Sequence, residues 1–130
     1  RTVTKHYQAL VQGHIQQSGS VDVPLITDWE NRPRQMVHFE LGKQAKTIFQ
    51  LMKYDAETDQ SRVRLEPVTG RSHQLRVHMM HIGHPIMGDK LYHPEPPTFH
   101  LKRMALHATY LAFQHPLKMH DIELYSDVEF

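Results

Sequence analysis

The sequence predicts an α+β fold in which a mainly antiparallel sheet carries few short helices. Most apolar segments are short, rich in β-branched and aromatic residues, and separated by polar turns, as in a sheet. Residues 72–82 are the clearest segment with apolar side chains at helical spacing. The length of 130 residues suits one domain with a single core. Strands that outnumber helices in this way favour the α+β class.

The N-terminal half is predicted to consist of strands joined by turns. Residues 1–12 place Val3, Tyr7, Ala9 and Val11 on one parity, which predicts a strand with two different faces. Gly13 and the polar residues through Ser20 are expected to end this strand. The next segments are an edge strand or extended loop at residues 21–26, which contains Pro24, a turn at residues 28–33 and a strand at residues 36–40.

The following segments are predicted to complete the sheet. Residues 45–54 predict a strand, although their apolar spacing would also allow a short helix. Residues 61–68 alternate Val63 and Leu65 with charged residues, which indicates a half-buried strand with a basic face. The last expected elements are a proline-containing loop at residues 93–98 and strands at residues 105–113 and 122–125, separated by a turn at His115 and Pro116.

One helix is predicted between these strands. Ser72 is a favourable N-cap residue, and Leu75, Met79 and Ile82 follow at helical spacing. Gly83 is suited to end the helix, with Pro85 just beyond it. A helix of about eleven residues is too short to be stable alone, so we expect it to pack against the sheet.

Composition excludes several classes of protein. Without cysteine, the chain has no disulfides, no thiolate nucleophile and no zinc–thiolate site. No apolar run approaches the roughly 18 residues that span a bilayer, and residue 1 does not begin a signal-peptide pattern. We therefore expect a cytoplasmic protein, with a monomer as the default state. The net charge of +1 does not by itself indicate a nucleic-acid partner.

The histidines raise the alternative of a metal protein. His73, His78, His81 and His84 follow one another closely, and His78 and His81 could share one helical face. No carboxylate lies among them, and the helical motif with a general-base glutamate between its histidines is absent. We therefore interpret them as packing or surface residues and expect no metal.

The most informative segment is residues 69–92, around the predicted helix. Arg76 is either a solvated arginine or a fork of donors aimed at a carboxylate or phosphate, a role that the planar guanidinium suits. The loop after the helix has glycines at Gly83 and Gly88 flanking apolar residues, which permits tight turns or a close backbone approach to a ligand. Arg76 and this loop are thus candidates for a binding site.

Taken together, these motifs resemble a known family. The strings G-R-S-H-Q-L-R-V-H at residues 70–78, G-H-P-I-M-G-D at residues 83–89 and L-Y at residues 91–92 resemble the C-terminal signature of RluA-type RNA pseudouridine synthases. Lys5-His6-Tyr7 resembles their K-x-Y motif, and Leu106-His107-Ala108, preceded by Arg103, resembles their late L-H-A strand. The turn at residues 28–33 resembles members of the family that act on both ribosomal and transfer RNA.

The resemblance implies the pseudouridine synthase catalytic-domain fold, with residues 1–130 as its C-terminal portion. It also implies isomerisation of uridine to pseudouridine in structured RNA without a cofactor. The essential aspartate of the family lies in an H-R-L-D motif upstream of K-x-Y, and this motif is absent from the 130 residues. Asp22, Asp28 and Asp89 do not occur in such a motif. We therefore expect the chain to belong to a longer protein and to be inactive alone.

The resemblance also suggests roles for individual residues. Tyr7 matches the tyrosine that packs against the target base, and Arg76 matches the arginine that pairs with the catalytic aspartate. Leu75 is expected to form part of the apolar wall of the uracil pocket, while Arg71 and His73 are expected to contact phosphate or brace the helix. Further candidates for RNA contact are Arg32, Arg34, Arg62 and Arg64.

A different class of function is also consistent with the sequence. A non-catalytic RNA-binding module could keep this fold after losing the aspartate. The sequence encoded before residue 1 distinguishes the two hypotheses, because only an enzyme requires the H-R-L-D motif there.

Overall fold

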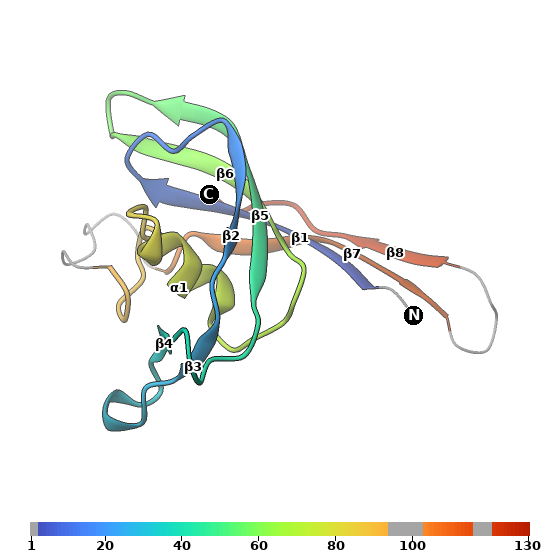
Figure 1. The fold of residues 1–130 in the computed structure, drawn as a ribbon. Helices are drawn as coiled ribbons and strands as arrows, with labels where there is room; N and C mark the ends of the chain where they lie inside the picture. The colour runs from blue at the N-terminus through green and yellow to red at the C-terminus, as the bar shows by residue number, and fades with distance from the viewer. Residues whose placement is uncertain (1–2, 94–102, 116–120) are drawn as a thin grey trace.

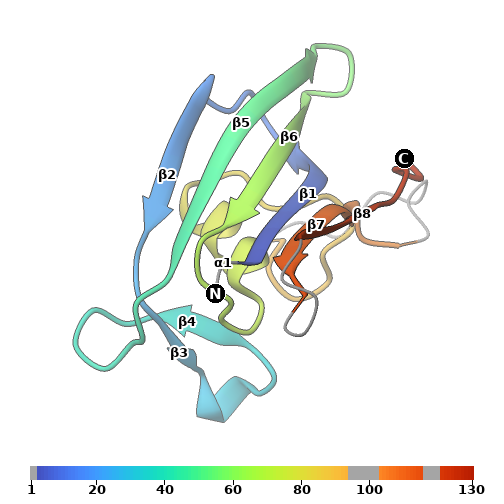
Figure 2. The same cartoon turned by 90° about the vertical axis from the view of Figure 1, so that its right-hand side faces the viewer.

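A computed structural model describes residues 3–93, 103–115 and 121–130 of the chain (Figure 1). Six strands form one antiparallel sheet in the order β2-β5-β6-β1-β7-β8 (Figure 2). The one α-helix among the described residues, α1 (Gln74–His81), lies against one face of this sheet. The six strands are β1 (Val3–Gln12), β2 (Ser18–Asp22), β5 (Lys46–Asp55), β6 (Gln60–Pro67), β7 (Leu106–Gln114) and β8 (Asp121–Tyr125). The predicted α+β class with a mainly antiparallel sheet is confirmed.

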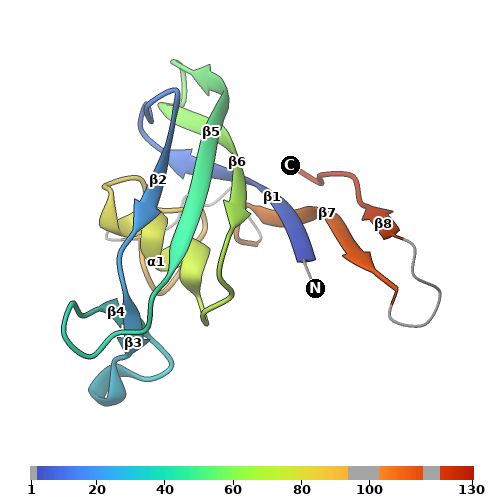
Figure 3. The ribbon, with the colours of Figure 1, turned by 45° about the vertical axis from the view of Figure 1, so that its right-hand side comes forward.

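A small hairpin lies at one end of the sheet, away from β8 (Figure 3). It pairs β3 (Leu25–Thr27) with β4 (Gln35–Val37), and the short 3-10 helix η1 (Trp29–Asn31) lies between the two strands. β4 packs against α1, so the hairpin is held beside the helix. The hairpin therefore places the predicted turn at residues 28–33 near the element that carries Arg76.

The core lies between the sheet and α1, as the alternation in the central strands predicts. Ala9 pairs with Val63 across β1 and β6, and both side chains are fully buried. Leu75 and Met79 of α1 pack into the same cluster. Burial of these apolar side chains is what holds so short a helix in place. The arginines of β6 project from the opposite face, which confirms its predicted two-sided character.

The start of the helix differs from the prediction. Ser72 is not the N-cap; that position is taken by His73, whose backbone is left-handed with φ 56° and ψ 20° and whose side chain makes no capping hydrogen bond. The left-handed residue turns the chain sharply before Gln74, which leaves Ser72 outside the helix. The end of the helix is as predicted: Gly83, at φ +89°, and His84 donate to the carbonyls of Met80 and Met79 in a Schellman arrangement.

Other element boundaries also differ from the prediction. The first strand ends at Gln12, just before Gly13, as predicted, but the polar segment that follows includes the start of β2 at Ser18, which pairs with β5. The strand expected at residues 36–40 is shorter and lies at Gln35–Val37. Residues 46–55 form a strand rather than the alternative helix. The loop expected at residues 93–98 and the turn at His115–Pro116 lie largely outside the described residues. Among the residues that the structure describes, no helix is long and apolar enough to cross a bilayer.

Candidate active site

Three motifs that are far apart in the sequence line one cavity of about 210 Å³, which we call the motif cavity. Lys5 and Tyr7 come from β1, Leu75 and Arg76 from α1, and Leu106 from β7. The remaining lining residues belong to the segment that leads into the helix: Pro67, Thr69, Gly70, Arg71, His73 and Gln74. The K-x-Y, G-R-S-H-Q-L-R and L-H-A segments therefore meet at a single place.

The position of Tyr7 depends on an irregularity between β1 and β7. The register shifts between His6, which pairs with Tyr110, and Tyr7, which pairs with Ala108. The Thr109 hydroxyl donates to the carbonyl of His6 at 3.1 Å and so occupies the widened position. An irregularity of this kind, a β-bulge, changes the direction of neighbouring side chains. Here it lies directly before Tyr7, whose aromatic ring lines the motif cavity.

The helix is fixed to the sheet by two buried polar residues of the G-R-S-H-Q-L-R-V-H motif. Gln74 donates from Nε2 to the Thr47 hydroxyl at 3.0 Å and to the Lys46 carbonyl at 2.8 Å. The Thr47 hydroxyl lies 2.8 Å from Nδ1 of His78, and Nε2 of His78 lies 3.0 Å from the Val23 carbonyl. Burial lowers the pKa of His78. Its neutral ring therefore donates to Val23 and accepts the proton of Thr47. These bonds leave Leu75 and Arg76 to line the cavity.

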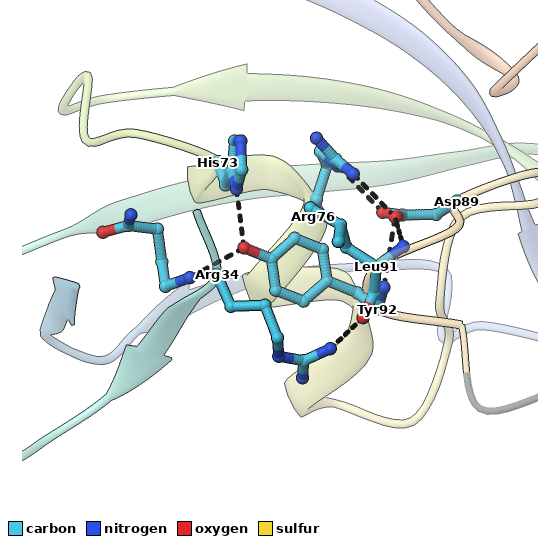
Figure 4. A network of polar contacts seen from close by, with 7 residues as sticks. Arg34, His73, Arg76, Asp89, Leu91 and Tyr92 are labelled. Atoms are coloured by element: carbon cyan, nitrogen blue, oxygen red, sulfur yellow. Dashed lines mark hydrogen bonds and ion pairs between the residues drawn. The ribbon is translucent and has the colours of Figure 1, made fainter. Parts of the chain in front are cut away.

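Arg76 is held by a carboxylate of the following loop. Its Nε and Nη2 donate to the two oxygens of Asp89 at 3.0 and 2.8 Å, which is the bidentate geometry that a guanidinium favours. The Asp89 side chain is fully buried, whereas 18% of the Arg76 side chain is exposed. In Figure 4 one nitrogen of the guanidinium points away from Asp89. Among the described residues, that nitrogen, Nη1, has no hydrogen-bond partner.

Asp89 also organises its own loop. Its Oδ1 accepts the backbone N–H groups of Leu91 and Tyr92 at 3.0 and 3.1 Å. Burial alone would raise the pKa of Asp89, but the hydrogen bonds from Arg76 and these N–H groups, with the charge of the guanidinium, outweigh it. The resulting pKa lies below the ordinary value, so Asp89 is an anion at neutral pH. Its charge is neutralised by Arg76.

Tyr92 links this ion pair to the hairpin (Figure 4). The guanidinium carbons of Arg76 and Arg34 lie 5.1 and 4.9 Å from the centre of its ring. Its hydroxyl accepts the N–H of Gln35 at 2.8 Å and lies 2.6 Å from Nδ1 of His73. Burial and the nearby Arg76 lower the pKa of His73, so its neutral Nδ1 accepts the phenol proton. This bond supports the left-handed backbone of His73.

The structure brings together only some of the residues that the sequence singled out. Tyr7, Leu75, Arg76, Arg71 and His73 all line the motif cavity. Arg34 does not face outward, because it donates to the carbonyl of Leu91 and packs on Tyr92. Arg32 is exposed and lies over the ring of Trp29. Arg62 and Arg64 project from the sheet face opposite α1 and bond Gln8 and Gln50.

Sequence reasoning assigned no role to several residues of the site. Asp89 and Tyr92 were visible only as parts of the G-H-P-I-M-G-D and L-Y strings, and Lys5 as part of K-x-Y. The strings themselves were the available signal, since each ends on a residue that contacts Arg76 or lines the cavity. Gly88 was expected to allow a close backbone approach. It does so against the chain itself, because an added Cβ would lie 2.8 Å from the Arg103 carbonyl oxygen.

The histidines of the central segment have separate partners. His73 contacts Tyr92, His78 contacts Thr47 and Val23, and His84 contacts the carbonyl of Gln12. Throughout the part of the chain that the structure describes, no three His, Cys, Asp or Glu side chains gather to hold a metal ion. The interpretation of His78 as a packing residue agrees with its position.

Comparison with known proteins connects this geometry to a family. Residues 1–81 match the family described as RNA pseudouridylate synthase. The chain is 53% identical over 119 residues to the dual-specificity RNA pseudouridine synthase RluA of Pasteurella multocida, covering 90% of this chain and 53% of that protein. It is 48% identical over 117 residues to the Escherichia coli K12 protein of the same name, covering 89% and 53%. The chain thus spans about half the length of the curated relatives it matches.

Solved structures show the same likeness. The human RNA pseudouridylate synthase domain containing 1 protein superposes with a TM-score of 0.78 and 31% identity, covering 96% of this chain and 54% of that one. The human domain containing 4 protein superposes with a TM-score of 0.74, and its 22% identity supports the fold alone. The family match covers 81 of the 130 residues, and both the fold and the meeting of the three motifs in one cavity agree with it. This chain therefore belongs to the RNA pseudouridylate synthase family.

Proposed function

We propose that this chain forms part of the active site of an enzyme that isomerises uridine to pseudouridine in structured RNA. The observation that carries the proposal is the meeting of Tyr7, Leu75 and Arg76 in the motif cavity. The substrates that we propose are ribosomal RNA and stem–loops of transfer RNA, because the bacterial relatives are named dual-specificity RNA pseudouridine synthases. Such an enzyme would act in the cytoplasm, as a monomer and without a cofactor.

The residues of the cavity suit this chemistry. Pseudouridine forms when the bond from ribose to N1 of uracil breaks and a bond to C5 replaces it, while C5 loses a proton and N1 gains one. The reaction is an isomerisation, so no redox partner is needed. Tyr7 offers a flat ring on which uracil can stack and a phenol near the base. Leu75 supplies an apolar wall that excludes water from the base.

Arg76 is proposed to orient the catalytic carboxylate. Asp89 holds its Nε and Nη2, while Nη1 remains available to a second anion. We propose that this anion is the aspartate of an H-R-L-D motif, supplied from outside the 130 residues. An adjacent fixed cation would keep that aspartate ionised. In this arrangement residues 1–130 are the C-terminal portion of one catalytic domain, inactive alone.

The substrate uridine must leave its stack to enter the cavity. Extrusion of a base costs a few kcal/mol and is least costly in loops, which suits a stem–loop substrate. Arg71 and His73 border the cavity and are proposed to contact the phosphates of the extruded nucleotide or to brace the helix. Arg32 is proposed to contact the RNA backbone from the hairpin. For Arg34, Arg62 and Arg64 the same role requires that they give up present contacts.

The test is turnover by the product of the complete gene. Conversion of uridine is measured by liquid chromatography of the nucleosides from digested RNA, because the two isomers have the same mass but separate on a column. We expect Arg76→Met to abolish pseudouridine formation and leave the fold intact. Lys53→Met is the control, because Lys53 is an exposed cation of β5 that does not line the motif cavity, and it should retain activity. Near-normal turnover by Arg76→Met, or pseudouridine made by residues 1–130 alone, would contradict the assigned roles.

The same assay separates this proposal from a non-catalytic RNA-binding module with the same fold. A module would bind RNA but form no pseudouridine, even as the complete gene product. The sequence upstream of residue 1 gives an independent answer, because only the enzyme requires H-R-L-D there.

A further inference from the structure

A second cavity of about 400 Å³ adjoins the motif cavity, and we call it the hairpin cavity. Arg71 lines both cavities and therefore marks the boundary that they share. The lining of the hairpin cavity includes Trp29 from η1, Lys43 from the segment before β5, and Ser72, which precedes α1. An RNA strand with one nucleotide in the motif cavity would thus pass directly to the hairpin cavity.

Trp29 is unusually open for a tryptophan. It is 65% exposed in the 3-10 helix η1, although tryptophan is among the side chains that gain most from burial. The guanidinium carbon of Arg32 lies 5.3 Å from the ring centre, over one face of the indole. That contact orients the ring while leaving its other face without a stacking partner among the described residues. An exposed, oriented aromatic ring is the kind of platform on which unpaired bases stack.

The charge of the hairpin cavity suits a polyanion. Among the described residues, its lining includes the cations of Lys43 and Arg71 and no acidic side chain. Arg71 is anchored by two hydrogen bonds, from its Nε to the Gln44 carbonyl at 2.8 Å and from its backbone N–H to Gln74 Oε1 at 3.0 Å. Because Nε is used for anchoring, the terminal amines of the guanidinium remain available at the boundary of the two cavities. A phosphate that joins two nucleotides would lie at that boundary.

We propose that the hairpin cavity binds an unpaired nucleotide adjacent to the target uridine, with its base stacked on Trp29 and the linking phosphate bound by Arg71 and Lys43. This inference rests on the proposed function, since the motif cavity is taken to hold the uridine. It goes further in assigning a second subsite. The ligand class is a single-stranded segment of RNA, because a base inside a duplex is already stacked on both faces and has none free for Trp29.

The test compares Trp29→Ala, Trp29→Phe and Phe39→Ala in the complete gene product. Phe39 is the matched control, because it is 73% exposed and follows the same hairpin but does not line the cavity. Affinity is measured by fluorescence anisotropy of a labelled RNA stem–loop with uridines in its loop, and turnover is measured on the same RNA. A fully paired duplex without a loop serves as the second probe.

We expect Trp29→Ala to weaken binding of the stem–loop by about 5- to 150-fold, the range found when a stacking aromatic is removed. Trp29→Phe should retain most of the affinity, and Phe39→Ala all of it. The effect of Trp29→Ala should be absent on the duplex and should appear in KM rather than in kcat. Lys43→Ala should lower the slope of log affinity against log salt by about one.

The outcomes distinguish this subsite from the proposed function. Normal pseudouridine formation with wild-type affinity in Trp29→Ala would overturn the subsite and leave the function standing. Binding that depends on Trp29, without pseudouridine from any variant, would support the subsite and overturn the enzyme. If Phe39→Ala weakened binding as much as Trp29→Ala, or if the duplex showed the same loss, specific stacking on Trp29 would be wrong.

Discussion

The carboxylate of Asp89 receives both Nε and Nη2 of Arg76, at 3.0 and 2.8 Å, from a position that is only 1% exposed. The same carboxylate closes the loop that carries Tyr92, whose ring packs against Arg76. The guanidinium is therefore oriented by the loop that follows the helix, and the motif cavity receives it already fixed. Three predictions rest on this arrangement and on the bonds that hold α1 to the sheet, and a fourth rests on the space around three glycines.

Replacing Asp89, which orients Arg76, should reduce turnover although Arg76 itself is kept. In Asp89→Asn the charge that holds the guanidinium is lost, so Arg76 can rotate away from the motif cavity. Small misplacements of a catalytic group cost roughly 10²-fold, and we expect a fall in kcat of about 10- to 100-fold for the complete gene product. Glu129→Gln, which frees the exposed Arg103, is the control and should be silent. Wild-type kcat in Asp89→Asn would show that turnover does not require Asp89 to orient Arg76.

The contribution of Asp89 to stability should depend on pH. Its folded-state pKa lies below its ordinary value of 3.8, so its contribution is complete above that value and is lost as pH falls through the folded pKa. At pH 7 we expect Asp89→Asn to lower the free energy of unfolding by about 3 kcal/mol, because it leaves a largely buried guanidinium without its counter-ion. In urea titrations the gap between variant and wild type should be constant from pH 7 to about 5 and narrow below about 4. A gap that stayed constant at lower pH would contradict the depressed pKa.

The anchor of the helix should be sensitive to a single hydroxyl. Thr47→Val keeps the shape of the buried side chain but removes the acceptor for Gln74 and the donor for His78. Leaving these groups unsatisfied should cost about 1–3 kcal/mol of unfolding free energy, measured by chemical denaturation. Thr58→Val, in the exposed turn between β5 and β6, should change it by less than about 0.5 kcal/mol. Equal effects of the two substitutions would mean that the Gln74–Thr47–His78 chain contributes nothing to stability.

Three glycines should respond to alanine in a defined order. Gly88→Ala meets both a left-handed backbone, at φ +80°, and the Arg103 carbonyl oxygen 2.8 Å from the new Cβ. Gly83→Ala has the same backbone strain but open space, so it should lose only the roughly 1–2 kcal/mol of a left-handed residue. Gly70→Ala has no close neighbour and should be near neutral. Thermal melts that rank Gly83→Ala below Gly88→Ala would contradict the close approach at Gly88.

Much of the fold was predictable because its signals are local. The alternation of Val63 and Leu65 with arginines specified a two-sided strand, and β6 has this form. Gly83 predicted the end of the helix, since few other residues adopt its backbone conformation. The start was mistaken because Ser72 is a good cap only if the chain enters the helix there. The contact between His73 and Tyr92, 19 residues apart, supports a different entry.

The sequence alone determined the strands, the single helix and the order of the motifs that resemble the pseudouridine synthases. These depend on side-chain period and turn chemistry, which act between near neighbours. Only the tertiary structure decided which charged groups meet. It paired Arg76 with Asp89, turned Arg34 onto Tyr92, placed Arg62 and Arg64 on the far face of the sheet, and brought Trp29 and Arg71 to the lining of one cavity. Ion pairs and cavities form between side chains brought together by strand register and helix packing, and no local pattern specifies those partners.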